Sequence, residues 1–113
     1  MKKSFFALLI LVSVPLFIRA DPPKKLNLSY DGESKKLKIE AIHPVKNVNN
    51  HYIDLISISV DGKEVKVIKP QKQSDAGAEV AEVSIPQISK GCKVTVKARC
   101  NEFGSKTKSI TIE

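Results

Sequence analysis

Two histidines and two cysteines are the residues of this chain with the most specific chemistry. His43 is followed by a proline, and His51 comes eight residues later, across a polar, asparagine-rich loop and just before the apolar run 53–60. Neutral imidazole is the commonest metal ligand in proteins, and loops on a rigid scaffold often carry binding sites. The pair is therefore a candidate metal site, although its spacing alone is equally typical of two solvated loop histidines, and residues further along the chain have to decide between the two.

The two cysteines bracket one predicted strand, whose length decides whether they can pair. Eight residues separate Cys92 from Cys100, which at about 3.3 Å per residue places them about 26 Å apart. A disulfide needs Cα atoms within about 7 Å, so we expect no bond between them. Cys92 is then a small buried side chain or an intermolecular link. Cys100 ends the strand before the turn 101–104, so its thiolate is a candidate metal ligand, the alternative being an inert half-buried thiol.

The first twenty residues have the organisation of a secretory signal peptide. A basic start precedes the apolar run 5–18, which is too short to span a bilayer comfortably, since spanning takes about 20 residues. Ala20 is the small residue that a signal peptidase needs, so we expect cleavage before Asp21 and a periplasmic or secreted protein; retention as an anchor is the alternative. Cleavage takes three cationic residues with it, so 93 of the 113 residues remain and the net charge falls from +7 to +4.

The charge pattern of the remaining chain favours neither nucleic acid nor a membrane as a partner. Its lysines are spread along the sequence and mostly alternate with apolar residues, without an arginine cluster or interleaved aromatic residues. The sequence also holds no glycine-rich phosphate loop and no Ser/His/Asp pattern with a nucleophile elbow. These observations exclude the common nucleotide-dependent and hydrolytic enzymes, and they leave the oligomeric state open.

Beyond residue 25 the sequence alternates apolar and polar residues, with turn signals every eight to twelve residues. Residues 37–41 and 92–98 alternate most regularly, and the apolar phase of 53–60 slips between Leu55 and Ile56, which indicates a bulge or burial on both faces. Asp61-Gly62 is a strong hairpin signal, and 69–77 is predicted to be a loop. About seven antiparallel strands and no helix are expected. They imply one all-β domain, residues 21–113, folded as an immunoglobulin-like β-sandwich.

Three motifs stand in a recognisable order: His-Pro from residue 43, HYIDLISISVDGK from residue 51, and Cys-Asn-x-x-Gly from residue 100. Together they resemble the iron domain of desulfoferrodoxin and neelaredoxin, the superoxide reductases, over nearly all of the chain from residue 26. The resemblance implies an immunoglobulin-like sandwich whose iron is held by four histidines and an axial cysteine, with a sixth position open to superoxide. By position it implies His43, His51 and Cys100 as ligands of a mononuclear, non-haem iron.

The chain departs from the family pattern at two of the five ligand positions. The family turn is Cys-Asn-x-His-Gly, and Phe103 stands at its histidine, where we expect a core or rim aromatic that fills the space of the lost ligand. The family's Glu-Lys-His segment corresponds to residues 22–26, which hold no histidine. The loop between the two histidines is also about two residues longer than usual, and the rubredoxin-like cysteine domain of desulfoferrodoxin has no counterpart here.

Two functions are consistent with this partial match. In the first, the chain is a superoxide-reductase-like iron protein that reduces superoxide to hydrogen peroxide with electrons from an unidentified donor. Because thiolate and imidazole also suit copper and zinc, these metals are kept as alternatives. In the second, the chain is a metal-free β-sandwich that serves binding or structure in the cell envelope.

Overall fold

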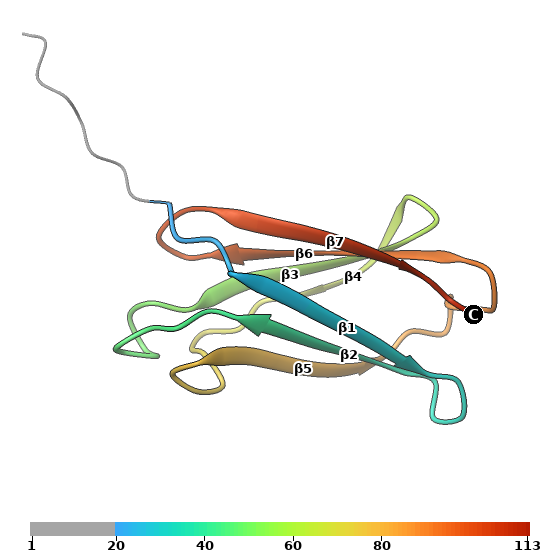
Figure 1. Cartoon of the computed structure of the whole chain (residues 1–113), viewed down its shortest axis with the longest axis horizontal. Coiled ribbons are helices and arrows are strands. Elements are labelled where there is room, and N and C mark those ends of the chain that lie inside the picture. The colour runs from blue at the N-terminus through green and yellow to red at the C-terminus, as the bar shows by residue number, and fades with distance from the viewer. Residues whose placement is uncertain (1–19) are drawn as a thin grey trace, which may run out of the picture.

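The computed structural model describes residues 20–113, which form two antiparallel β-sheets packed face to face (Figure 1). Its seven strands are β1 (Lys25–Asp31), β2 (Lys36–Ile42), β3 (Ile53–Val60), β4 (Lys63–Ile68), β5 (Ala78–Ser84), β6 (Lys93–Cys100) and β7 (Ser105–Thr111). One sheet has the order β1-β2-β5 and the other β4-β3-β6-β7. The predicted all-β sandwich of about seven antiparallel strands is confirmed. The expected signal peptide lies outside the described residues except for Ala20.

The core lies between the sheets because alternate residues of the strands point inward. Every second side chain of β2 and β6 is buried, and β3 adds three fully buried isoleucines. Burying a side chain of this size stabilises a fold by about 1.5–3 kcal/mol. The apolar residues of these three strands with no exposed surface are Leu37, Ile39, Ala41, Ile53, Ile56, Ile58, Val94, Val96 and Ala98.

Two local features predicted from the sequence are present. Asp61 and Gly62 both have positive φ, 50° and 87°, as the two-residue turn between β3 and β4 requires. The pairing of β3 with β6 shifts register between Ile53 and Leu55, which confirms an irregularity close to the predicted slip. The segment 69–77 connects β4 to β5 and contains no strand.

The outer strands of the larger sheet carry some of the chain's exposed lysines. The edge strands β4 and β7 carry exposed lysines at positions 63, 66, 106 and 108. A charged side chain on a sheet edge hinders pairing with a strand of another molecule. Solvation and edge protection explain these four lysines. The described residues contain no helix long and apolar enough to cross a membrane.

Candidate metal centre

Four segments meet at the end of the sandwich where β2 and β6 finish and where β1 and β3 begin (Figure 1). His43 directly follows β2, His51 precedes β3 by two residues, Cys100 is the last residue of β6, and Asp21 lies in the segment before β1. The antiparallel pairing of Ile53 with Cys100 places the end of β6 beside the start of β3. The strand order therefore brings His43, His51 and Cys100 to the same end of the sandwich.

The three predicted ligands converge, and a fourth side chain joins them. Donor atoms of Asp21, His43, His51 and Cys100 all lie within 4.8 Å of one another. Asp21 Oδ2 is 2.9 Å from His51 Nε2 and 3.4 Å from His43 Nε2. The two imidazole rings meet edge to face, with centroids 4.9 Å apart and planes at 89°. Two nitrogens, a sulfur and a carboxylate oxygen thus surround one small volume.

The dimensions of this cluster suit a single metal ion. Metal bonds to sulfur, nitrogen and oxygen are about 2.0–2.3 Å long, so two ligand atoms on opposite sides of one ion are at most about 4.6 Å apart. The longest separation in the cluster, 4.8 Å, exceeds that limit only slightly. A soft thiolate combined with imidazoles and a carboxylate is compatible with iron, zinc or copper.

His51 shows the strongest sign that a cation belongs here. Its Nε2 is buried and has no hydrogen-bond partner. Asp21 Oδ2 lies only 2.9 Å away, but the two atoms are not aligned for a hydrogen bond, so their proximity does not satisfy the nitrogen. An unpartnered buried polar atom carries a desolvation cost of about 1–3 kcal/mol, and native structures rarely leave one unexplained. A cation between the donor atoms would partner His51 Nε2.

Cys100 is held at the site by its own turn. Its side chain is 2% exposed, and its sulfur accepts a 3.4 Å contact from the main-chain N–H of Glu102. The main-chain N–H of Cys100 donates to the Gly104 carbonyl at 2.8 Å, which closes the turn. These two contacts fix the position of the sulfur beside the histidines.

Asn101 joins the cysteine turn to the histidine loop. Its side-chain oxygen accepts from the Tyr52 N–H at 2.9 Å, and its amide donates to the Asn50 carbonyl at 2.9 Å. Its main-chain N–H donates to the Tyr52 carbonyl at 2.9 Å. Three hydrogen bonds from one residue therefore position His51 opposite Cys100, which explains why asparagine follows the cysteine.

Sequence reasoning missed Asp21 and placed Phe103 only in part. The Asp21 N–H donates to the Phe103 carbonyl at 2.8 Å, so the segment before β1 lies against the cysteine turn. A core position for Phe103 is wrong, because 56% of this residue is exposed, and it lies at the rim of a surface depression that contains Cys100. Gly104, at φ 103°, turns the backbone so that the Phe103 carbonyl faces the incoming segment. Asp21 supplies the carboxylate that joins the two histidines.

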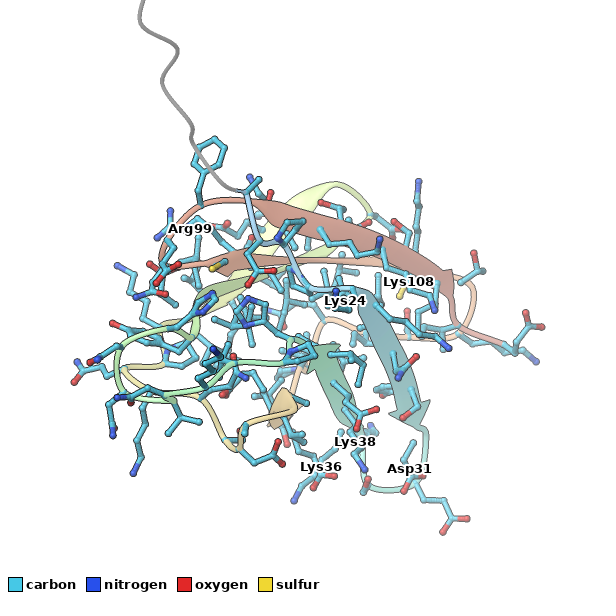
Figure 2. All side chains as sticks on the ribbon, turned by 60° about the vertical axis from the view of Figure 1, so that its left-hand side comes forward. Lys24, Asp31, Lys36, Lys38, Arg99 and Lys108 are labelled. Carbon is cyan, nitrogen blue, oxygen red and sulfur yellow. The ribbon has the colours of Figure 1, made fainter. Side chains whose placement is uncertain are left out.

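The surface around the cluster is hollowed on two sides. One open depression, about 540 Å³, is lined by 44–47 and His51 and includes the exposed Lys46. A second, about 430 Å³, contains Cys100 and the ion pair of Arg99 with Asp54. The hydrogen bonds that Arg99 donates to the Asp54 carboxylate raise the pKa of Arg99 above its usual value. Figure 2 turns this end of the sandwich toward the viewer and labels Arg99 there.

Comparison with solved structures finds a crystal structure of superoxide reductase in the oxidized state. The two chains share 16% sequence identity, the match covers 88% of this chain and 94% of that chain, and the TM-score is 0.51. The chain is similar in fold to a superoxide reductase. At this level of identity the likeness concerns the fold alone. No protein-family profile and no curated protein sequence matches the chain.

Proposed function

We propose that this chain is a superoxide-reductase-like protein that holds one metal ion, iron in the first place, between Asp21, His43, His51 and Cys100. The observation that carries the proposal is the convergence of four potential ligand atoms within 4.8 Å, one of them a buried nitrogen without a partner. The similarity in fold to a superoxide reductase and the motif order in the sequence support iron.

The charges of the donor set also favour a divalent cation. Two neutral imidazoles, one thiolate and one carboxylate carry a summed charge of about −2, which a divalent ion neutralises. Cys100 is almost completely buried, where an uncompensated thiolate charge would be costly. A bound cation would therefore stabilise this buried cluster more than it would stabilise the same four residues on a solvent-exposed surface.

The residues around the cluster supply the other requirements of superoxide reduction. A ferrous ion bound here would supply the electron that reduces superoxide. Lys46 places a positive charge in the depression beside His51, which favours the approach of a small anion. Glu102, whose side chain is 55% exposed, has a carboxylate oxygen 3.8 Å from His51 Nε2 and is placed to carry protons between solvent and the site. The electron donor is a separate partner.

Zinc or copper is the second candidate for the same site. Four donor atoms from four segments would give a four-coordinate ion, the coordination number typical of zinc, and a His₂Cys set suits copper. An intense blue colour on addition of Cu(II) would favour copper. Elemental analysis that finds only iron in the purified protein would dismiss both.

A metal-free sandwich that serves binding or structure in the cell envelope is the alternative from a different class. It is favoured by the two missing family histidines, because a superoxide reductase with an incomplete ligand set can lose its metal while it keeps its fold. Stoichiometric metal that disappears in a Cys100→Ala variant would exclude this alternative.

The deciding experiment is metal analysis of anaerobically purified protein, combined with its visible spectrum after oxidation. We expect about one iron per chain and a thiolate-to-iron charge-transfer band that is lost in Cys100→Ala. The iron protein should then consume superoxide and produce hydrogen peroxide when a reductant is present. Protein that binds no iron after anaerobic reconstitution would contradict the proposal.

We further propose that residues 1–20 are a signal peptide and that the chain acts in the periplasm or outside the cell. Cleavage before Asp21 would make the carboxylate-bearing residue of the cluster the first residue of the mature protein. N-terminal sequencing of the exported protein is expected to begin at Asp21. A cut even one residue later would remove a proposed ligand and would favour the metal-free alternative.

The strand order supports an immunoglobulin-like assignment of the sandwich. The chain changes sheets after β2, β4 and β5, so that the three-stranded sheet contains β1-β2-β5 and the other β4-β3-β6-β7. Crossovers of this kind between two antiparallel sheets are the Greek-key connections of immunoglobulin-like domains.

A further inference from the structure

Gln73 is a buried polar residue that the proposed function has not used. It lies in the connection between β4 and β5, it is 1% exposed, and its side chain reaches His43, which precedes it by thirty residues. Its Oε1 is 2.8 Å from His43 Nδ1. Gln73 is therefore the residue on the far side of the imidazole from the cluster.

The orientation of the Gln73 amide is fixed by groups other than the imidazole. Its nitrogen donates to the His43 carbonyl at 2.7 Å and to the Asp75 carbonyl at 3.0 Å. Its oxygen accepts from the Ile53 N–H at 3.3 Å. A flipped amide would oppose its oxygen to two carbonyl oxygens and its NH₂ to an N–H. Only the observed orientation satisfies all three main-chain contacts.

This orientation determines which nitrogen of His43 carries the proton. Because Oε1 can only accept, Nδ1 must donate to it. A neutral imidazole has one N–H, so Nε2 is left with a lone pair. That lone pair faces the Asp21 carbonyl oxygen at 2.9 Å and Asp21 Oδ2 at 3.4 Å, which are both acceptors. No proton of a neutral ring is available for either contact.

We propose that Gln73 is a positioning residue that selects the Nδ1–H form of His43 and so keeps Nε2 free to bind a cation. Without the amide, the opposite tautomer would donate from Nε2 to the Asp21 carbonyl oxygen, and a proton would occupy the place of the metal. The consequence for metal binding rests on the proposed function. The choice of tautomer does not, because it can be measured in metal-free protein.

The test compares Gln73→Leu, Gln73→Glu and the control Gln71→Leu, which changes an exposed glutamine two residues away. Long-range ¹⁵N–¹H NMR of metal-free protein, in buffer alkaline enough for neutral imidazole, reports the tautomer. A His51→Asn variant assigns the His43 signals. We expect the Nδ1–H form in wild type and Gln71→Leu, and the Nε2–H form in Gln73→Leu. In Gln73→Glu the carboxylate still accepts from Nδ1, so the Nδ1–H form should persist.

Affinity for Co(II), a spectroscopic probe, provides the second measurement. Gln73→Leu is expected to weaken Co(II) binding by about 10–100-fold, the usual cost of losing a residue that orients a metal ligand. Gln73→Glu should bind at least ten times more tightly than Gln73→Leu, although both lose the amide N–H groups that join the loops. A purely structural role for Gln73 would predict equal or greater damage from glutamate.

Three results would overturn the inference: an Nε2–H tautomer in wild type, an unchanged tautomer in folded Gln73→Leu, or a glutamate variant as weak as the leucine variant. Circular dichroism establishes that each variant is folded. If wild-type protein binds no Co(II) while its tautomer depends on Gln73 as described, the proposed function fails and the tautomer assignment stands.

Discussion

Cys92 directly precedes β6 and Cys100 ends it, and the two cysteines are both buried but have different chemical neighbours. Cys92 is 6% exposed and Cys100 is 2% exposed, and both are free. Each sulfur accepts one main-chain N–H at 3.4 Å, from Ser89 and Glu102 respectively. Yet Cys92 belongs to the apolar core cluster, whereas Cys100 lies within 4.8 Å of imidazole and carboxylate atoms.

This difference shows that burial and an N–H contact do not by themselves make a thiol a metal ligand. What distinguishes Cys100 is the set of segments that end beside it. The two ends of the sandwich can therefore be compared residue by residue, with the far end as an internal control (Figure 1).

The largest effect that we expect is a difference in metal content between alanine variants of the two cysteines. Cys100→Ala should abolish metal binding, because it removes the only sulfur in the cluster. Cys92→Ala should leave the metal content unchanged, and it should lower stability by about 1 kcal/mol because it empties space in the core. Metal analysis and thermal unfolding of both variants distinguish these effects. Equal metal loss in the two variants would mean that the cluster is not where the metal binds.

A smaller effect, on Co(II) affinity, is expected from two aspartates near opposite ends of β1. Asp21 precedes β1 at the cluster. Asp31, labelled in Figure 2, ends β1 at the far end of the sandwich. Asp21→Asn removes a ligand charge but leaves its main-chain contacts, so we expect Co(II) affinity to fall at least about tenfold with little change in stability. Asp31→Asn should leave Co(II) affinity unchanged, since the Asp31 carboxylate accepts hydrogen bonds only from Glu33 and Ser34 in its own turn.

Titration with Co(II) measures both aspartate variants. An Asp21→Asn protein that binds as tightly as wild type would limit the site to His43, His51 and Cys100. Asp21 would then not be a ligand, and the ligands would be the three residues predicted from the sequence.

The strands could be predicted because the signals that specify them, apolar alternation and turn residues, lie within short stretches of the sequence. Alternation of apolar and charged residues reports which side chains face the core, and Asp61-Gly62 supplies the two positive φ angles of its turn. The convergence of His43, His51 and Cys100 followed from motif order and from their positions at strand ends. The absence of a disulfide followed from the length of β6.

The remaining parts of the site depend on contacts between segments that no local pattern encodes. Asp21 lies in a coil segment, and only its hydrogen bond to the Phe103 carbonyl places it at the cluster. Gln73 is one polar residue in a polar loop, and nothing in its neighbours indicates burial. Antiparallel topology does place the start of β1 near the end of β2, so a search for ligands before residue 25 could have found Asp21.

The smallest effect on Co(II) affinity is expected from alanine variants of two glycines. They test whether a displacement of Asp21 weakens metal binding. Gly104 and Gly91 both have positive φ, 103° and 89°, so alanine at either should cost about 1 kcal/mol, or a fall of about 4–8 °C in Tm. A Cβ at Gly104 would lie 2.9 Å from Pro22 Cδ and 3.2 Å from Asp21 N, whereas one at Gly91 meets nothing within 4 Å. Gly104→Ala should therefore also displace Asp21 and weaken Co(II) binding severalfold.

Gly91→Ala is the control for backbone strain, because it shares the unfavourable φ and lies at the far end of the sandwich. If both variants lose similar stability and only Gly104→Ala loses Co(II) affinity, the close contact between the cysteine turn and the segment before β1 is what positions the carboxylate. If both keep wild-type affinity, that segment adapts to the added methyl group. The placement of Asp21 is then set by its attraction to the cation, with the 2.8 Å hydrogen bond to Phe103 as a secondary contact.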